Sequence, residues 1–397
     1  MANTPPQLSL QTNQQNSPKP LRQVPSNLTP PVTPISKESN HQEPSPSQDR
    51  NASQSQSASK YVSTLHFTDD LEICRTDDNR PFEFGRGVWS IVYKARYTPQ
   101  TPNGHPNTPP STPTTQPQIL AVKAPLRRDA NPVLKAEAAI LTRLSRVQGH
   151  ENHLVPFHGY HTELGALIMT AVPTSLASYI ETQAEQARIH GPTTATMFDP
   201  VQGPTSFREM AGKLITGLNW LHEVAGVVHG DIKPQNILLR PVETDSEEGK
   251  CAFEYEPLFC DFSATVEIRT DGDDKPVDTT RASMSSFTPP FTAPEMLASL
   301  MCSEMAPTAA SDVFSMAATL LAAATGDLLL YSNMNHRLRL EMARAGHQIV
   351  DFARSGGSGC RVPRNGFVER VVQPAVVKDP AERISTAKWV ELVSGSA

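Results

Sequence analysis

The stretch VVHGDIKPQN at residues 227–236 brings three side chains of complementary chemistry close together. Asp231 can accept a hydroxyl proton, Lys233 can neutralise a transferred phosphate, and Asn236 can bind a divalent cation. Twenty-five residues past Asn236, Asp261 follows an apolar strand and offers a second oxygen ligand for a hard cation. A lone Asp in a turn is usually a cap or a solvated residue, but chance rarely supplies this order of groups. The order therefore predicts metal-assisted transfer of a phosphoryl group.

Upstream residues could hold the phosphates of a nucleotide. The stretch GRGVWSIV at 85–92 is a glycine-rich turn between strands, where backbone N–H groups can approach phosphates. Alone this signal is weak, because Ser90 stands in place of a third glycine. Lys123 follows on a strand, and Glu137 is the only acidic residue of the next predicted helix and its expected partner. Taken singly, each of these residues is better explained without a functional role, as an ordinary strand-end Lys and an exposed Glu.

The elements that carry these groups form a strand-rich first part and a helical second part. Strand composition and helical spacing of apolar residues distinguish the two parts. The predicted elements are strands at 82–97, 119–125, 153–160 and 166–173 and amphipathic helices at 131–147 and 207–224.

Two segments lack the composition of a folded core. Residues 1–60 are rich in Pro, Ser, Gln, Asn and Thr and contain no aromatic residue, so we expect a disordered tail. Its Ser/Thr-Pro dipeptides are either phosphorylation or docking sites or simply part of a solvated tail. The Pro/Thr-rich stretch at 98–118 interrupts patterned sequence and predicts a long surface insertion in a hairpin, which costs little free energy.

Charge and cysteine usage exclude several classes of protein. The 397 residues carry a net charge of −6, which gives no indication of binding to nucleic acid or to an anionic membrane. The five scattered cysteines predict free thiols in a reducing compartment: Cys74, Cys251, Cys260, Cys302 and Cys360. The apolar run at 315–331 is interrupted by Gly326 and Asp327, short of the roughly 20 residues of a spanning helix. With no signal peptide at its start, the chain is expected to be intracellular, in the cytoplasm, the nucleus or both.

The ordered motifs resemble the eukaryotic protein kinase family over about residues 70–395. The matching motifs, in order, are the glycine-rich loop, LAVK, HGDIKPQN, DFS, TAPE, SDVFS and DPAERIS. The resemblance implies an α+β fold with two lobes within a domain at 61–395. The first lobe, at about 70–170, is a small antiparallel sheet with one helix, and the second, at about 174–395, is mainly helical.

The resemblance also implies ATP between the lobes, held with Mg²⁺. The residues implied in nucleotide binding are Gly85, Gly87, Ser90, Val92, Ala121, Lys123, Met169, Thr170, Val172 and Leu238. The implied catalytic residues are Asp231, Lys233, Lys123 and Glu137. Asn236 and Asp261 are the implied metal ligands, and Glu295 is expected to pair with Arg383 to hold the end of the activation segment.

The implied activity is transfer of the γ-phosphate of ATP to Ser or Thr hydroxyls of protein substrates. Lys233 after the catalytic Asp, together with Thr288, follows the Ser/Thr-kinase pattern, whereas tyrosine kinases usually carry Arg or Ala in place of the Lys. The sequence identifies no regulatory partner. The alternative is a pseudokinase, a kinase fold kept as a scaffold or allosteric partner; loss of Lys123, Asp231 or Asp261 would have favoured it.

Three residues depart from the family motifs. Ser90 is expected to stiffen the glycine-rich loop, and Ser263 replaces a glycine that tolerates positive φ, which predicts a less mobile Asp261. Gly230 replaces the arginine that receives an activation-segment phosphate in many relatives, unless Arg127 or Arg128 takes that role. We therefore expect basal activity to depend little on the hydroxyls ahead of Thr288, which are Thr279, Thr280, Ser283, Ser285 and Ser286.

Two further features can each be interpreted as structural or as functional. The stretch GHENHLVPFHGYH carries four histidines: His150, His153, His158 and His161. They could suggest a metal site, although solvated or capping roles are expected at this place in the chain. Cys260 precedes Asp261 and is interpreted as a small buried apolar residue. The other interpretation is a thiol that an ATP-site ligand could reach.

Overall fold

Antiparallel strands from the first part of the chain form a single sheet. The strands are β1 (Glu72–Ile73), β2 (Glu83–Arg86), β3 (Ser90–Tyr97), β4 (Gln118–Pro125), β5 (Phe157–His161) and β6 (Ala166–Thr170). Their order is β1-β3-β4-β6-β5, with β2 paired to β3. The register places Lys123 opposite Val92 on β3 and Leu167 on β6, so this lysine lies on an interior strand.

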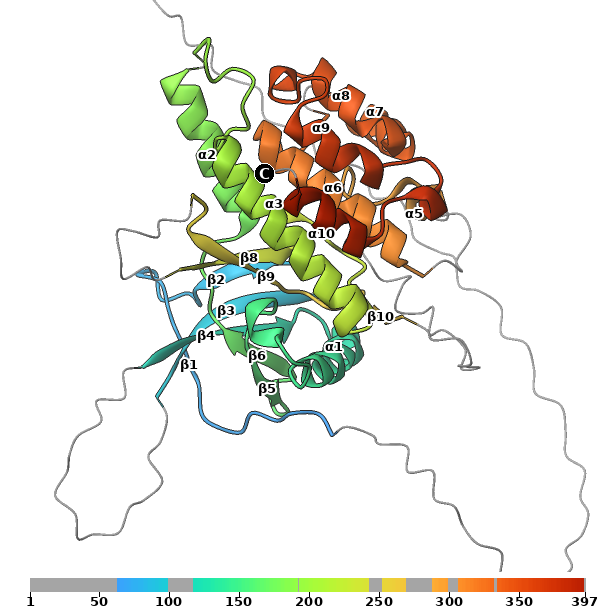
Figure 1. Cartoon of the computed structure of the whole chain (residues 1–397). Helices are drawn as coiled ribbons and strands as arrows, with labels where there is room; N and C mark the ends of the chain where they lie inside the picture. Colours follow the sequence, from blue (N-terminus) through green and yellow to red (C-terminus); the bar gives the residue numbers. More distant parts are fainter. Residues whose placement is uncertain are drawn as a thin grey trace, which may run out of the picture. The chain divides into compact units, whose positions relative to one another are not determined.

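Helix α1 (Asn131–Leu144) lies against this sheet (Figure 1). Pro132 occupies its first turn, where a missing backbone N–H costs nothing. Leu134, Ala138 and Leu141 are buried at helical spacing, as the sequence predicts, and Glu137 is buried on the same face. A carboxylate among these apolar residues requires a partner, because burying an unpaired charge is costly.

The second part of the chain is mainly helical. Its helices are α2 (Leu176–His190), α3 (Pro204–Asn219), α5 (Pro294–Ala298), α6 (Ala309–Thr325), α7 (His336–Arg344), α8 (Ile349–Ser355), α9 (Phe367–Val372) and α10 (Thr386–Ser394). Helix α3 packs against α10 and α6 (Figure 1). Most of α6 is buried, which explains the apolar residues of the run at 315–331 as far as Thr325, where the helix ends. Among the described residues, no helix is long and apolar enough to cross a membrane.

Two short strand pairs position the loops that carry the candidate catalytic groups. Strand β7 (Val227–Val228) pairs with β10 (Val266–Glu267), and β8 (Ile237–Pro241) pairs with β9 (Tyr255–Phe259). The loop from 229 to 236 connects β7 to β8, and the loop from 260 to 265 connects β9 to β10. The two loops therefore run side by side, joined by a 3.0 Å hydrogen bond from Cys260 N to Asn236 O.

This arrangement, seen in a computed structural model, confirms the predicted α+β fold with a sheet-based lobe and a helical lobe. The structure describes residues 63–98, 117–191, 193–242, 252–268, 288–298, 306–331 and 334–395. The predicted tail at 1–60, nearly all of the insertion at 98–118 and the hydroxyl-rich segment before Thr288 lie outside the described residues. Within the described part of the chain, Cys74, Cys260 and Cys360 are free thiols.

The first described residues are attached to the sheet. Leu65 donates its N–H to Thr142 Oγ1 at 2.9 Å and accepts from Tyr160 N at 2.8 Å. Phe67 N donates to Tyr160 O at 3.2 Å, and the Phe67 ring packs edge-on against Tyr97, with 5.4 Å between centroids. Residues 65–67 therefore extend the sheet lobe before β1.

We expect removal of residues 1–62 to change neither the melting temperature nor the affinity for ATP, because that segment has little apolar surface to contribute. A chain beginning at Thr68 also loses the three hydrogen bonds of Leu65 and Phe67. At about 1 kcal/mol each, their loss is expected to lower the melting temperature by several degrees. Calorimetry of the two truncated chains tests this. If the melting temperature of the chain beginning at Ser63 fell by several degrees, the tail would be shown to stabilise the domain.

Candidate active site

A cavity of about 560 Å³ collects the residues that the sequence analysis singled out. This volume is typical of small-molecule sites. Its lining includes the predicted nucleotide-binding residues Gly85, Gly87, Ser90, Val92, Ala121, Lys123, Met169, Thr170, Val172 and Leu238. It also includes the predicted catalytic and metal-binding residues Glu137, Asp231, Lys233, Asn236 and Asp261. Residues from the sheet, α1 and the two loops of the helical part thus meet around one space.

Lys123 is the centre of a charged cluster on one side of this cavity. Its Nζ donates to both Glu137 oxygens at 2.8 Å and to Asp261 Oδ1 at 2.8 Å. Phe262 N donates to Glu137 Oε1 at 3.0 Å, which ties the loop after β9 to helix α1. Lys123 and Glu137 are buried, so their pairing is screened little by solvent.

Burial and the neighbouring charges together shift the pKa of each member of this cluster. Burial opposes the charge on Lys123, but the carboxylates of Asp261 and Glu137 outweigh it and raise the pKa of the ammonium. Burial raises the pKa of Glu137 in spite of the neighbouring lysine. Although burial acts in the opposite direction on Asp261, Lys123 and Ser263 hold the pKa of its carboxyl below the usual range. Lys123 is therefore a cation, and Asp261 an anion, at neutral pH.

Asp231 lies in a second hydrogen-bonded group in the loop between β7 and β8. Its Oδ2 accepts from Lys233 Nζ at 2.7 Å and from Asn236 Nδ2 at 3.0 Å. Asn236 Nδ2 also donates to Asp231 O at 2.8 Å, and Lys233 Nζ reaches Thr288 Oγ1 at 3.3 Å. Burial raises the pKa of Asp231 against the opposing charge of Lys233. The contacts fix the orientation of the Asp231 carboxylate.

Asp312 supports this loop from within the helical part. The residue lies in the first turn of α6 and is 1% exposed. Its Oδ2 accepts from His229 N at 2.7 Å, its Oδ1 accepts from Gly230 N at 2.9 Å, and His222 Nε2 lies 3.1 Å from Oδ2. The SDVFS motif in the sequence did not indicate this role. An acidic residue in an otherwise apolar helix was the available signal.

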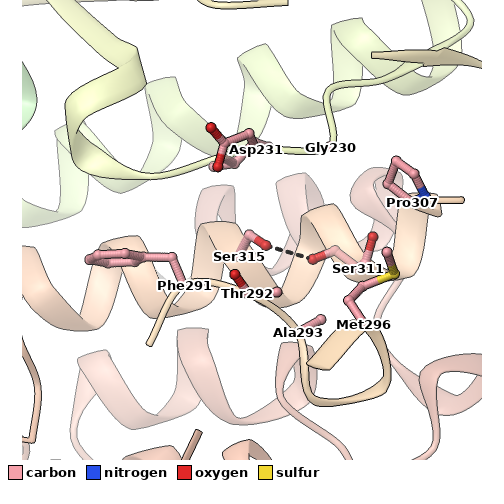
Figure 2. Close-up of a pocket in the computed structure, with 10 residues that line it drawn as sticks. Gly230, Asp231, Phe291, Thr292, Ala293, Met296, Pro307, Ser311 and Ser315 are labelled. Carbon is pink, nitrogen blue, oxygen red and sulfur yellow. Dashed lines mark hydrogen bonds between the residues drawn. The ribbon is translucent and has the colours of Figure 1, made fainter. Parts of the chain in front are cut away.

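Gly230 has a backbone conformation that side chains disfavour. Its φ is +83°, and a Cβ at this position would lie 2.5 Å from Ala264 O and 3.0 Å from Pro307 Cγ. Figure 2 shows Gly230 and Pro307 beside a small cavity of about 20 Å³, room for about one water molecule. The glycine is therefore required by this local packing. Glycine at position 230 therefore has two consequences: the arginine of the family motif is absent, and the backbone can pack closely against Ala264 and Pro307.

We expect Gly230→Ala to lower the free energy of unfolding by about 2 kcal/mol or more, because left-handed backbone and a close contact both add to the cost. Gly226→Ala is the matched control: φ is +66° there, but no atom lies within 4 Å of an added Cβ. Urea unfolding of both variants separates the two contributions. Equal losses in the two variants would contradict the close approach to Ala264.

The structure shows which residue of the DFS motif has a positive φ. Positive φ occurs at Asp261, at 63°, whereas Ser263 is not among the described non-glycine residues with positive φ. The backbone constraint at the DFS motif thus falls on the aspartate, a residue type that tolerates the left-handed region. Ser263 contributes a hydrogen bond instead, from its Oγ to Asp261 Oδ1 at 2.8 Å.

Other predicted contacts are also present. Arg383 forms a bidentate ion pair with Glu295, with both N···O distances at 2.7 Å, as the family resemblance implies. Arg127, considered as a substitute cation, lies 5.0 Å from the Trp89 ring centroid and donates to Asp129 at 3.2 Å. Arg127 is therefore engaged by Trp89 and Asp129.

The histidines of 150–161 make separate contacts. His150 Nδ1 lies 2.9 Å from Val147 O, His158 Nε2 lies 2.9 Å from Thr170 Oγ1, and His161 Nδ1 accepts from Leu164 N at 3.4 Å. His153 stacks on Trp220, and burial lowers the pKa of the His153 ring. These contacts fit structural roles.

Cys260 lines the main cavity next to Asp261. Burial raises the pKa of its thiol to about 12. Because the thiolate is the reactive form, Cys260 is expected to react slowly with thiol reagents at neutral pH. This supports its interpretation as a small apolar residue.

Comparison with known proteins agrees with this geometry. The family model of the protein kinase domain matches residues 117–392, and the chain belongs to this family. The chain is 32% identical over 188 residues to the serine/threonine-protein kinase PknK of Mycobacterium tuberculosis, and the Mycobacterium bovis protein of the same name is 31% identical. Each match covers 47% of this chain and only 14% of the relative. These relatives are bacterial and give no support to the nuclear location that the sequence left open.

Proposed function

We propose that the chain is a protein kinase that transfers the γ-phosphate of ATP to Ser and Thr hydroxyls of protein substrates. The proposed kinase domain spans residues 61–395, and 1–60 form a tail outside it. The observation that carries the proposal is the simultaneous contact of Lys123 with Glu137 and Asp261, in the same cavity as an oriented Asp231. Phosphoryl transfer depends mainly on positioning and on electrostatic stabilisation, which this arrangement supplies.

The cavity fits the two chemically distinct ends of ATP. Apolar side chains suit the adenine ring: Val92 and Ala121 on the sheet side, Leu238 on the opposite side and Met169 at the back. We assign the backbone of 170–172 to contacts with the adenine edge. The glycine-rich turn at 85–87, where the backbone can approach closely, and the ammonium of Lys123 suit the phosphates.

Asn236 and Asp261 fit a divalent cation. Both line the cavity and both carry oxygen atoms, the ligand type that Mg²⁺ prefers. The side chain of Asp261 is 36% exposed, and its recorded hydrogen bonds among the described residues both fall on Oδ1. Asn236 and Asp261 would hold Mg²⁺, which would supply neutralisation of the charge that develops during transfer.

Asp231 is the proposed base. Lys233 and Asn236 hold its carboxylate toward the cavity that both residues line. We propose that Asp231 orients the substrate hydroxyl and accepts its proton as the oxygen bonds to the γ-phosphorus and ADP leaves. Lys233 would stabilise the negative charge on the transferred group.

Preference for Ser and Thr rests on two observations. Lys233 bridges Asp231 and Thr288, the pattern of Ser/Thr kinases in the family resemblance. The mycobacterial relatives are named serine/threonine-protein kinases. The pseudokinase alternative has no observation in its favour, because Lys123, Asp231 and Asp261 are present and contact the groups expected of them.

The test is phosphorylation of a peptide library by the purified full chain with Mg²⁺ and ATP, with Ser, Thr and Tyr as acceptors. We expect phosphate incorporation into Ser and Thr peptides. An Asp231→Asn variant serves as the inactive reference. Incorporation no greater than in that variant would support a pseudokinase. Incorporation mainly into Tyr peptides would contradict the assigned specificity.

A further inference from the structure

Ser263 and Lys123 share one oxygen atom of Asp261. Ser263 Oγ donates to Oδ1 at 2.8 Å, and Lys123 Nζ donates to the same atom at 2.8 Å. No recorded hydrogen bond from the described residues reaches Oδ2. One oxygen is thus held by the protein, while the other can take a ligand.

The two donors belong to different segments of the chain. Lys123 lies on β4, whereas Ser263 lies two residues after Asp261 in the loop that leads to β10. Asp261 itself has a positive φ of 63°. The glycine of the family motif D-F-G has no side-chain donor, so it could not make the second hydrogen bond. A departure from the motif therefore adds a contact to a candidate metal ligand.

We propose that Ser263 is a positioning residue for the divalent cation: its hydroxyl fixes the rotation of the Asp261 carboxylate and leaves Oδ2 for the metal. This inference rests on the proposed function, because it assumes that Asp261 binds the cation. Removing a hydrogen-bond partner of a metal-binding carboxylate typically lowers metal affinity by about 10-fold to 100-fold. Lys123 still holds Oδ1 when Ser263 is removed, so the lower end of that range applies.

The test measures metal binding without turnover. Mn²⁺ is titrated into the full chain with a non-hydrolysable ATP analogue, and the electron paramagnetic resonance signal reports free Mn²⁺. Ser263→Ala is expected to weaken Mn²⁺ binding about tenfold, whereas Ser263→Thr, which keeps the hydroxyl, stays within about threefold of the wild-type chain. Adenosine affinity is expected to stay within about twofold, because adenosine reaches only the apolar part of the cavity.

Ser355→Ala serves as the matched control, since it loses a 2.9 Å hydrogen bond to Asp351 O on the remote helix α8. Wild-type affinity for Mn²⁺ in Ser263→Ala would overturn the inference. An equal loss of adenosine affinity, or failure of threonine to restore Mn²⁺ binding, would also overturn it. If the wild-type chain with nucleotide bound no Mn²⁺, the proposed function itself would fail, and that result is distinct from the others.

Discussion

Replacing Asp261 with Asn is expected to lower the rate of phosphotransfer by about a thousandfold or more, which corresponds to about 4 kcal/mol of barrier. The substitution removes the proposed anionic ligand for the cation and one of the two carboxylates that contact Lys123. The fold is expected to persist. Asparagine tolerates the positive φ of this position, and its side-chain oxygen can still accept from Lys123 and Ser263.

The measurement is the initial rate of phosphate incorporation into a generic Ser/Thr substrate, with the melting temperature measured on the same sample. Asp351→Asn is the matched control, because its side chain is 73% exposed and pairs with Arg354 at 3.3 Å, away from the cavity. We expect the control to keep wild-type activity. An Asp261→Asn variant with activity within twofold of the wild-type chain would exclude the assigned metal site.

Replacing Lys123 with Met is expected to abolish phosphotransfer and also to lower stability. Glu137 is 1% exposed and loses its ion-pair partner, so we expect the free energy of unfolding to fall by about 3 kcal/mol. Adding Glu137→Gln removes the unpaired charge and keeps an oxygen that can accept from Phe262 N. The double variant should therefore recover part of the stability but none of the activity.

Urea unfolding and phosphotransfer assays on the two variants separate these effects. Arg344→Met is the control for loss of an ion pair at the surface, since Arg344 and Glu341 are 43% and 56% exposed. Such a pair contributes at most about 1 kcal/mol. If Lys123→Met retained substantial activity, Lys123 would not be the residue that grips phosphate. If the double variant were no more stable than Lys123→Met, the unpaired charge of Glu137 would not cause the loss.

The sequence by itself determined the class of fold and the residues that surround the cavity. Asp231, Lys233 and Asn236 lie within six residues of chain, so their proximity follows from covalent connection. Lys123 and Glu137 were predictable as partners because a strand-borne cation and the single carboxylate of the next helix are separated by only 14 residues. Their order along the chain, with Asp261, sufficed to predict the chemistry.

Tertiary packing decided the details that act on these residues. Asp312 supports the loop of His229 and Gly230 from more than 80 residues away, and no local pattern reports such a contact. The requirement for glycine at 230 comes from Ala264 and Pro307, which approach only in the folded chain. The hydrogen bond from Ser263 Oγ to Asp261 Oδ1, and the positive φ that falls on the aspartate, were likewise not indicated by the sequence pattern. Periodicity and spacing identify which face a residue occupies, whereas distances between atoms of separate loops depend on how the whole core packs.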